Sequence, residues 1–282
     1  MENNTYISNL DSLNQKIEQM KKQGASNLHI VSDFDRTLTK NFHEGEKLPS
    51  AVSLIRSGGY LTKDYPEKAY ALFDKYHPYE IDLSIPFEER SKKMTEWWEE
   101  HKKLFIASKM RKEIILDIVQ KNTCIFREYA NEVFDLLKEK DIPILIFSAG
   151  IGNIIEEFLK IKNKLTPNVY ILSNTFVFNE DGNATGYEGP IIHVFNKSEA
   201  QLKDPKYTKI IEERKNIILL GDNIEDLQMV ENIDKNLLIT IGFLNSNTEE
   251  NLEKYKEKFD IVITNDGSMK YVYDLVKEII QN

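Results

Sequence analysis

Short apolar runs alternate with helix-like segments along most of this chain, and this alternation narrows the possible folds more than any other feature. The runs are rich in Ile, Leu and Val, and the segments between them have the apolar spacing of helices. The runs are Leu28–Val31, Ile142–Phe147, Val169–Leu172, Ile217–Leu220, Leu237–Ile241 and Ile261–Ile263. Apolar strands separated by helices favour a mostly parallel sheet covered on both faces. We therefore predict an α/β fold.

One long segment interrupts the alternation. Between about residue 47 and residue 123 there is no convincing strand, and helical patterns cover Glu67–Tyr76, Phe87–Ala107 and Arg111–Gln120. Further on, Thr175–Phe178 and Ile191–Phe195 flank an Asp-Gly pair, which is a hairpin signal. We predict a core made of residues 1–45 and 124–282, with a helical domain inserted at 46–123.

Composition excludes several classes of partner. The net charge is −9 and no cluster of Lys and Arg is visible, so a nucleic-acid polymer is not expected. No apolar stretch approaches the roughly 20 residues that span a bilayer. Leu10, Leu13, Ile17 and Met20 have helical spacing and indicate a surface helix rather than a signal peptide. The single Cys124 cannot form an internal disulfide. We expect a cytoplasmic protein without a membrane partner.

Polar and ionisable residues follow four of the predicted strands or hairpin segments. They are Asp33, Asp35 and Thr37; Ser148, Ala149 and Gly150; Lys197; and Asp222 with Asp226. In an open parallel sheet, ligands bind beyond the carboxyl ends of the strands. These residues are therefore expected to meet at one site.

Each carboxylate in this set has a chemical use. Asp33 can attack phosphorus and form an acyl phosphate. Asp35 can protonate the leaving oxygen and then deprotonate the attacking water. Carboxylates beside a phosphate dianion need a hard cation, and Asp33, the backbone carbonyl of Asp35 and Asp222 offer oxygen ligands suited to Mg²⁺. Asp226 is expected behind these ligands or on a metal-bound water.

The remaining residues suit phosphate binding. Lys197 would neutralise charge on the phosphoryl oxygens, while Thr37, the Ser148 hydroxyl and the N–H groups of Ala149 and Gly150 could hold them. Taken alone, an Asp after a strand is more often a turn or cap residue, and a Lys is usually solvated. The Asp-x-Asp-x-Thr element followed later by Gly-Asp-x-x-x-Asp is hard to explain by caps. Together they predict a phosphoryl-transfer site.

These motifs resemble those of the haloacid dehalogenase superfamily. Longer stretches resemble the cytosolic 5′-nucleotidase III family, also called pyrimidine 5′-nucleotidases. The matching text includes Ser32-Asp33-Phe34-Asp35, Tyr79-Glu80-Ile81-Asp82, Glu96-Trp97-Trp98, Ser148-Ala149-Gly150, Phe195-Asn196-Lys197 and Gly221-Asp222.

The resemblance implies a Rossmann-like core with a helical cap, in which Asp33 is the nucleophile and Asp35 the acid/base. It implies a Mg²⁺ site completed by Asp222. It also implies phosphate contacts at Ser148, Ala149 and Lys197 and a base contact at Glu80. The implied reaction is hydrolysis of nucleoside 5′-monophosphates, with pyrimidines preferred, through an aspartyl-phosphate intermediate. We expect a monomer.

The chain departs from the family pattern at four positions. Arg36 replaces an apolar residue, Asn223 replaces a Ser, and Tyr129 stands where Gly is usual. His101 occupies the place of a substrate-contacting Ser, so we take it as a candidate substrate residue. These changes leave the expected chemistry intact and bear on base preference.

Three other functions remain open at this point. The chain could be a phosphatase for another small phosphate ester, or a phosphotransferase that passes the phosphate to a nucleoside instead of water. A non-enzymatic alternative is an inactive nucleotide-binding protein, although such a protein would have little reason to keep both Asp33 and Asp35. A signalling receiver domain lacks room for the helical insertion and lacks the second Asp.

Overall fold

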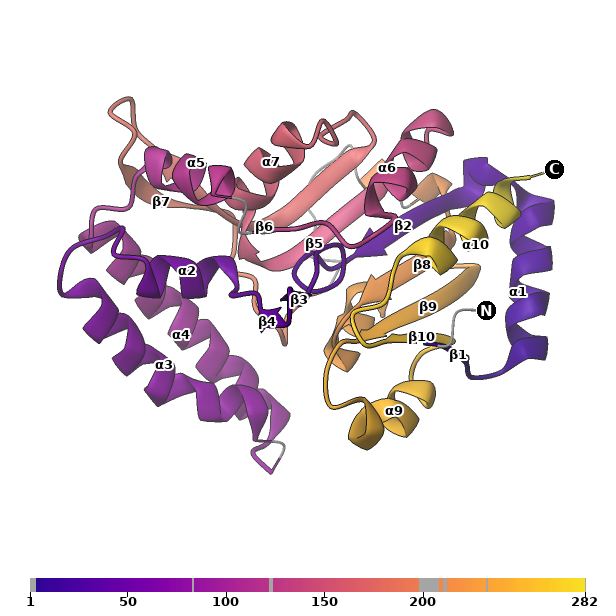
Figure 1. Ribbon diagram of the computed structural model, residues 1–282, viewed down its shortest axis with the longest axis horizontal. Helices are drawn as coiled ribbons and strands as arrows, with labels where there is room; N and C mark the ends of the chain where they lie inside the picture. The colour runs from indigo at the N-terminus through magenta and orange to yellow at the C-terminus, as the bar shows by residue number, and fades with distance from the viewer. Residues whose placement is uncertain are drawn as a thin grey trace.

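The protein is built around one twisted, mostly parallel sheet (Figure 1). The computed structural model describes residues 4–82, 84–121, 124–197, 208–209, 212–231 and 233–281. The strand order is β1-β10-β9-β8-β2-β5-β6-β7. The six central strands are parallel, and β1 and β7 pair antiparallel at the two edges. The strands are β1 Thr5–Ile7, β2 Leu28–Ser32, β5 Ile144–Ile151, β6 Val169–Phe178, β7 Ala184–Glu188, β8 Asn216–Gly221, β9 Leu237–Leu244 and β10 Ile261–Thr264.

Helices cover both faces of this sheet, as the unbroken apolar strands predict. Successive residues of a strand point to opposite faces, so Ile218 packs into one buried cluster and Leu219 into another. The first face is covered by α1 Leu10–Gln23, α6 Ala130–Glu139, α7 Gly152–Ile161 and α10 Lys270–Ile280. The second carries the 3₁₀ helix η3 Ile224–Val230 and α9 Thr248–Lys256.

The segment 51–120, between β2 and α6, is largely helical and lies toward the left in Figure 1. It contains α2 Ala51–Ser57, α3 Tyr65–Ile81, α4 Phe87–Ala107 and α5 Lys112–Gln120, which we call the helical region. A small hairpin, β3 Phe42–His43 with β4 Glu46–Lys47, leads into it. Helix α5 packs against α7 of the sheet layer, and α4 packs against β7. The predicted boundary at residue 123 lies outside the described residues.

The predicted strands and helices are confirmed in type, with one correction. The turn Asn179-Glu180-Asp181-Gly182 does connect a hairpin, but the partner of β6 is β7, and Ile191–Phe195 is not a strand. Those residues instead form a turn-containing loop that Asn174 fixes: its Oδ1 accepts from the Ile192 N–H at 2.9 Å, and its Nδ2 donates to the Ile192 carbonyl at 2.8 Å. Local apolar pattern could not distinguish this loop from a strand, because its Ile, Val and Phe residues are the types that strands favour.

Tyr129 has a φ of 67° at the start of α6, a backbone conformation that glycine adopts without strain, which accounts for glycine suiting this position. In the described part of the chain, no helix combines the length and apolar character required to cross a bilayer.

Candidate active site

The register of the sheet brings the predicted acidic residues together. Ser32 at the end of β2 pairs with Leu220 of β8 on one side and with Ile146 of β5 on the other. The chain leaves β2 toward β5 and later returns to β8, so the strand order reverses at β2. Residues that follow these three strands therefore share one edge of the sheet, at the switch point where ligands bind in such folds.

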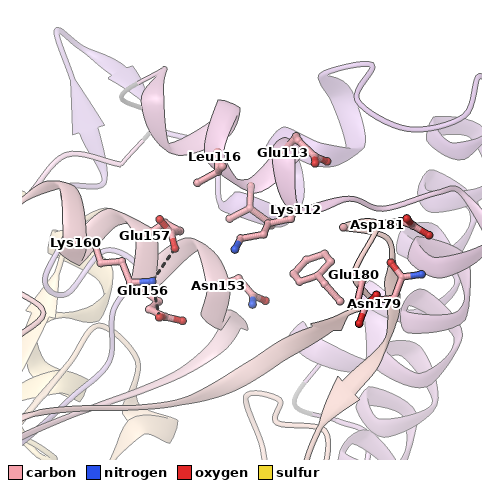
Figure 2. A pocket seen from close by; sticks show the side chains of 13 residues that line it. Lys112, Glu113, Leu116, Asn153, Glu156, Glu157, Lys160, Asn179, Glu180 and Asp181 are labelled. Atoms are coloured by element: carbon pink, nitrogen blue, oxygen red, sulfur yellow. Dashed lines mark hydrogen bonds and ion pairs between the residues drawn. The ribbon is translucent and has the colours of Figure 1, made fainter.

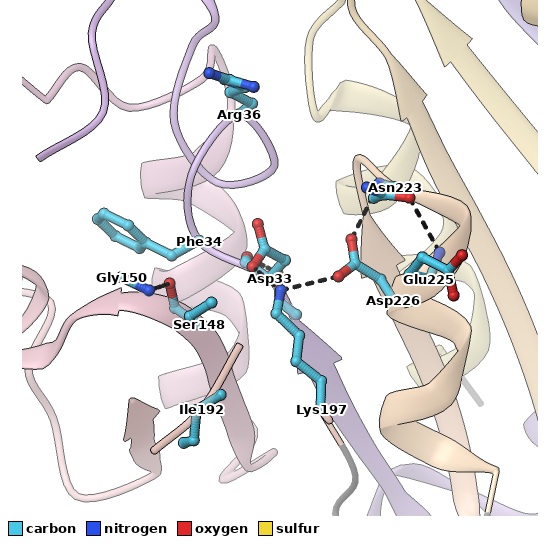
Figure 3. Close-up of polar contacts among 12 residues, drawn as sticks. Asp33, Phe34, Arg36, Ser148, Gly150, Ile192, Lys197, Asn223, Glu225 and Asp226 are labelled. Atoms are coloured by element: carbon cyan, nitrogen blue, oxygen red, sulfur yellow. Dashed lines mark hydrogen bonds and ion pairs between the residues drawn. The ribbon is translucent and has the colours of Figure 1, made fainter. Parts of the chain in front are cut away.

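Among the described residues, three carboxylates and one ammonium group meet at this edge. Figure 3 shows Asp33 and Asp226 on either side of Lys197. One carboxylate oxygen from each of Asp33, Asp222 and Asp226 lies within 4.8 Å of the others. The Lys197 ammonium donates to Asp33 Oδ1 at 2.5 Å and to Asp226 Oδ1 at 2.9 Å. Asp33, Asp226 and Lys197 are buried, and Asp222 is partly exposed. This carboxylate cluster contains the hard oxygen donors that a divalent metal ion needs.

The electrostatics of the cluster show an excess of negative charge. Burial raises the pKa of Asp33 to about 7; Lys197 opposes this rise, and Asp226 and Asp35 add to it. Burial also raises the pKa of Asp222, with the charges of Asp33 and Asp226 contributing. For Lys197, burial favours the neutral amine, but Asp226 and Asp33 outweigh it and hold the pKa above its usual value. One ammonium group does not balance three carboxylates, so a bound cation would lower these carboxyl pKa values.

Asp226 is held in the cluster by both of its carboxylate oxygens. Its second oxygen accepts from the Asn223 N–H at 3.0 Å, while Asn223 caps η3 by accepting from the Glu225 N–H. A side chain at Gly221 would collide with Asp226, because an ideal Cβ there would lie 2.6 Å from its Oδ2. Glycine before Asp222 thus lets Asp226 turn back toward Lys197. Asn223, where the family has Ser, keeps a capping oxygen.

The β5 end supplies the other predicted phosphate-binding groups. The Ser148 hydroxyl is buried and accepts from the Gly150 N–H at 3.0 Å. Asp35 lies against the same irregular end of β5, since an ideal Cβ on Gly150 would be 3.4 Å from Asp35 Oδ2. The carbonyl of Ala149 is held by Asn174 at 2.9 Å. Burial raises the pKa of Asp35, opposed by Arg36 and Lys197. A raised pKa suits a group that must hold and release a proton.

Thr37, also predicted in the site, is fully buried. Its hydroxyl has no hydrogen-bond partner within the described residues.

A residue that the sequence analysis missed fixes the loop after Asp35. Arg127 is 1% exposed, and it donates to the carbonyls of Arg36 at 2.5 Å, Thr37 at 2.9 Å and Gly267 at 2.8 Å. Asn245 donates to the Arg36 carbonyl as well, at 2.9 Å. Arg36 itself has a φ of 62°, a strained value for a residue with a side chain. These donors hold the Asp35 loop in its unusual conformation.

The two predicted residues of the helical region lie in different surroundings. Glu80, near the end of α3, has a side chain 37% exposed and pairs with His77 at 3.0 Å. His101 on α4 is buried, bonds the Tyr65 hydroxyl at 3.0 Å through Nε2 and stacks on Phe105 with ring centroids 4.3 Å apart. The structure thus places His101 in the packing between helices, while its assignment to substrate binding stays a prediction.

A separate hollow of about 570 Å³ lies between α5, α7 and the turn after β6 (Figure 2). Its charged lining is partly self-paired, because Lys160 bridges Glu156 and Glu157 at 2.7 and 2.8 Å. No member of the carboxylate cluster lines it. We assign the chemistry to the cluster and not to this hollow.

Comparison with known proteins gives consistent results. The family described as Pyrimidine 5′-nucleotidase (UMPH-1) matches residues 36–280. A 7-methylguanosine phosphate-specific 5′-nucleotidase A of Xenopus laevis is 35% identical over 272 residues, covering 96% of this chain and 92% of that protein. The 7-methylguanosine phosphate-specific 5′-nucleotidase of Homo sapiens is 35% identical over 263 residues, covering 93% and 87%.

A solved structure has the same fold along almost the whole chain. The crystal structure of cytosolic 5′-nucleotidase IIIB bound to cytidine superimposes with a TM-score of 0.91 at 32% identity, covering 99% of this chain and 94% of that one. With the carboxylate cluster at the switch point of a matching fold, the family predicted from the motifs is confirmed. The chain belongs to the cytosolic 5′-nucleotidase III (pyrimidine 5′-nucleotidase, UMPH-1) family of haloacid dehalogenase-like hydrolases.

Proposed function

We propose that this protein hydrolyses nucleoside 5′-monophosphates to nucleoside and phosphate through a phosphorylated Asp33, with Mg²⁺ as cofactor. The observation that carries the proposal is the meeting of Asp33, Asp222 and Asp226 with Lys197 at the carboxyl edge of the sheet. A buried carboxylate beside an ammonium group is poised to bind and attack an electrophilic phosphate.

The donor set fits a magnesium ion. The side chains of the cluster that could coordinate a metal ion all offer carboxylate oxygens. Mg²⁺ prefers such oxygen ligands over the nitrogen and sulfur ligands of softer metals. Asp33, Asp222 and the backbone carbonyl of Asp35 would hold the ion. Asp226 would act from behind them through its bond to Lys197. When bound, the ion would neutralise phosphate charge and polarise the phosphoryl oxygens.

The protein's own residues divide the remaining work. Asp33 forms the acyl phosphate, and Asp35, whose pKa is raised by burial, protonates the leaving ribose oxygen and later deprotonates water. Lys197 attracts the phosphoryl group and loses part of its pairing with Asp33 as that carboxylate reacts. The Ser148 hydroxyl and the Ala149 N–H are the neighbouring donors for phosphoryl oxygens, and the Gly150 N–H joins them by giving up its bond to Ser148.

Base recognition falls to the helical region, which we propose acts as a cap of residues 46–123 over the core 1–45 and 124–282. Glu80 is partly exposed near the end of α3 and can accept hydrogen bonds from a base. Cytosine offers an exocyclic amine, and 7-methylguanine offers an amine and a ring N–H on a cationic ring. A carboxylate suits both, which agrees with the names of the related enzymes.

The proposal also covers the cellular location and the oligomeric state. We propose that the protein acts in the cytoplasm, since the matching structure is named a cytosolic enzyme. We propose further that it acts as a monomer. With a net charge of −9 it has no electrostatic reason to bind nucleic-acid polymers.

A phosphate-release screen tests the proposal. The full chain is assayed on CMP, UMP, GMP, 7-methylguanosine 5′-monophosphate, sugar phosphates and para-nitrophenyl phosphate, each with Mg²⁺ and with EDTA. The proposal requires metal-dependent release that favours at least one nucleotide. Preference for a sugar phosphate contradicts it, and so does the absence of turnover on every substrate. Transfer of the phosphate to added nucleoside in place of water would identify a phosphotransferase.

A further inference from the structure

The loop that carries Lys197 is anchored in the helical region. Phe195, two residues before Lys197, is 4% exposed and forms one buried cluster with Tyr76 of α3 and Met94 of α4. The ring of Phe87 on α4 meets it edge-on, with centroids 5.6 Å apart. The phosphate-binding Lys is thus tied, through a neighbouring side chain, to helices that carry the predicted base contact.

Arg90 completes the connection to that base contact. It lies on α4, is 6% exposed, and its guanidinium carbon stands 4.4 Å from the centroid of the Phe195 ring. Its Nε donates to the Tyr79 carbonyl at 3.0 Å and its Nη2 to the Glu80 carbonyl at 2.8 Å. These are among the last carbonyls of α3, which lack partners inside the helix and attract a cation. One side chain therefore holds both the Glu80 backbone and the Phe195 ring.

A second contact, between His193 and Thr95, fixes the Lys197 loop on α4. His193 Nδ1 accepts from the Phe195 N–H at 3.2 Å, so Nε2 carries the hydrogen and donates to Thr95 Oγ1 at 3.0 Å. The Thr95 hydroxyl in turn donates to the Ser91 carbonyl at 3.2 Å. His193 is buried. The loop is consequently fixed on α4 at two points, and a displacement of α3 and α4 must be felt at Lys197.

We infer that Arg90 and Phe195 are positioning residues that couple base binding at Glu80 to the placement of Lys197 against the phosphate. This inference rests on the function proposed above. A bound base holds the end of α3, Arg90 transmits that position to Phe195, and Phe195 sets the Lys197 loop. A small ester without a base obtains no such help. The pair therefore raises kcat selectively for nucleotides.

Two conservative variants and one matched control test the coupling. Arg90→Lys keeps the charge but loses the planar group that donates to both carbonyls, and Phe195→Leu keeps an apolar side chain but loses the aromatic ring. Arg56→Lys is the control, because Arg56 of α2 stacks on Phe73 of α3, at 4.5 Å, within the helical region. The assay measures kcat and KM on the preferred nucleoside monophosphate and on para-nitrophenyl phosphate, with saturating Mg²⁺.

We expect each test variant to lose roughly tenfold in nucleotide kcat, or about 1.4 kcal/mol, while kcat on the small ester changes little. The double variant should lose no more than the worse single one, since both substitutions break one path. Arg56→Lys should keep the nucleotide advantage. Thermal melting identifies a variant that does not fold, and Arg90→Lys alone then decides the question.

Two results overturn the inference. Equal loss on both substrates would mean that the pair only supports the loop, and an unchanged nucleotide advantage would mean that it transmits nothing. Measurements on the wild-type enzyme separate these results from a failure of the proposed function. If the wild type does not favour the nucleotide over para-nitrophenyl phosphate, both the proposed function and the coupling are refuted.

Discussion

Replacing Asp226 by Asn should destabilise the protein, because no orientation of the amide satisfies both of its neighbours. Asp226 accepts from Lys197 through one oxygen and from the Asn223 N–H through the other, and its side chain is 2% exposed. An amide has one oxygen, so its NH₂ group must face one of these donors. Breaking a buried ion pair by removing one partner costs about 3–5 kcal/mol. Lys197 keeps Asp33, and loss of the Asp226 charge relieves its repulsion of Asp33 and Asp222. We therefore expect the low end of this range, a loss of about 3 kcal/mol in the free energy of unfolding, or a fall in Tm of roughly 6 °C for a chain of this size.

Thermal unfolding followed by circular dichroism, in chelator at neutral pH, measures this effect. Asp234→Asn is the matched control: Asp234 pairs with Lys215, but its side chain is 82% exposed, so its loss should change Tm very little. Adding Lys197→Met to Asp226→Asn should cost less than the sum of the single changes, because the ammonium that lacks its partner is gone. The reasoning is refuted if Asp226→Asn and Asp234→Asn melt alike, or if the double variant is strictly additive.

Three further outcomes follow from the site. Asp33→Asn should abolish phosphate release, and exhaustive chelation should do the same to the wild type; retained turnover in either case contradicts metal-assisted covalent catalysis. Glu80→Ala should raise KM for the preferred nucleotide and narrow its advantage over para-nitrophenyl phosphate, whereas equal damage to both would make Glu80 a structural residue. Burial lowers the pKa of His101 to about 4, so stability present above pH 6.5 is lost as pH falls toward 4. In urea titrations at pH 7 and 4.5, His101→Phe should reduce that loss by about 2 kcal/mol, and an unchanged loss would disprove a buried neutral imidazole.

The parallel sheet could be predicted because most of the central strands contain apolar runs that face both sides of the sheet. Ile217–Leu220 has no polar position to suggest an exposed side, and it is the core of β8 with helices on both faces. The short edge strand β1 could not be predicted, since three residues carry too little periodicity. Nor could the loop at Ile191–Phe195 be separated from a strand, because its conformation depends on contacts distant in sequence. Ile192 packs in the sheet core, Phe195 packs on the helical region, and Asn174 bonds the Ile192 backbone.

The residues that carry the chemistry are easier to find in the sequence than the residues that position them, and the cause is physical. Attack on phosphorus and charge neutralisation restrict the residue type, so Asp33 after β2 and Lys197 in its loop stand out. Positioning imposes no such restriction. Arg127 and Arg90 are long cations that sequence reasoning places at the surface, yet each is buried because backbone carbonyls of other elements need donors at that point. Both hold backbone rather than substrate, so their importance emerges only once the chain is folded. A variant series limited to recognisable motifs would therefore sample the reacting groups and leave the groups that hold them in place untested.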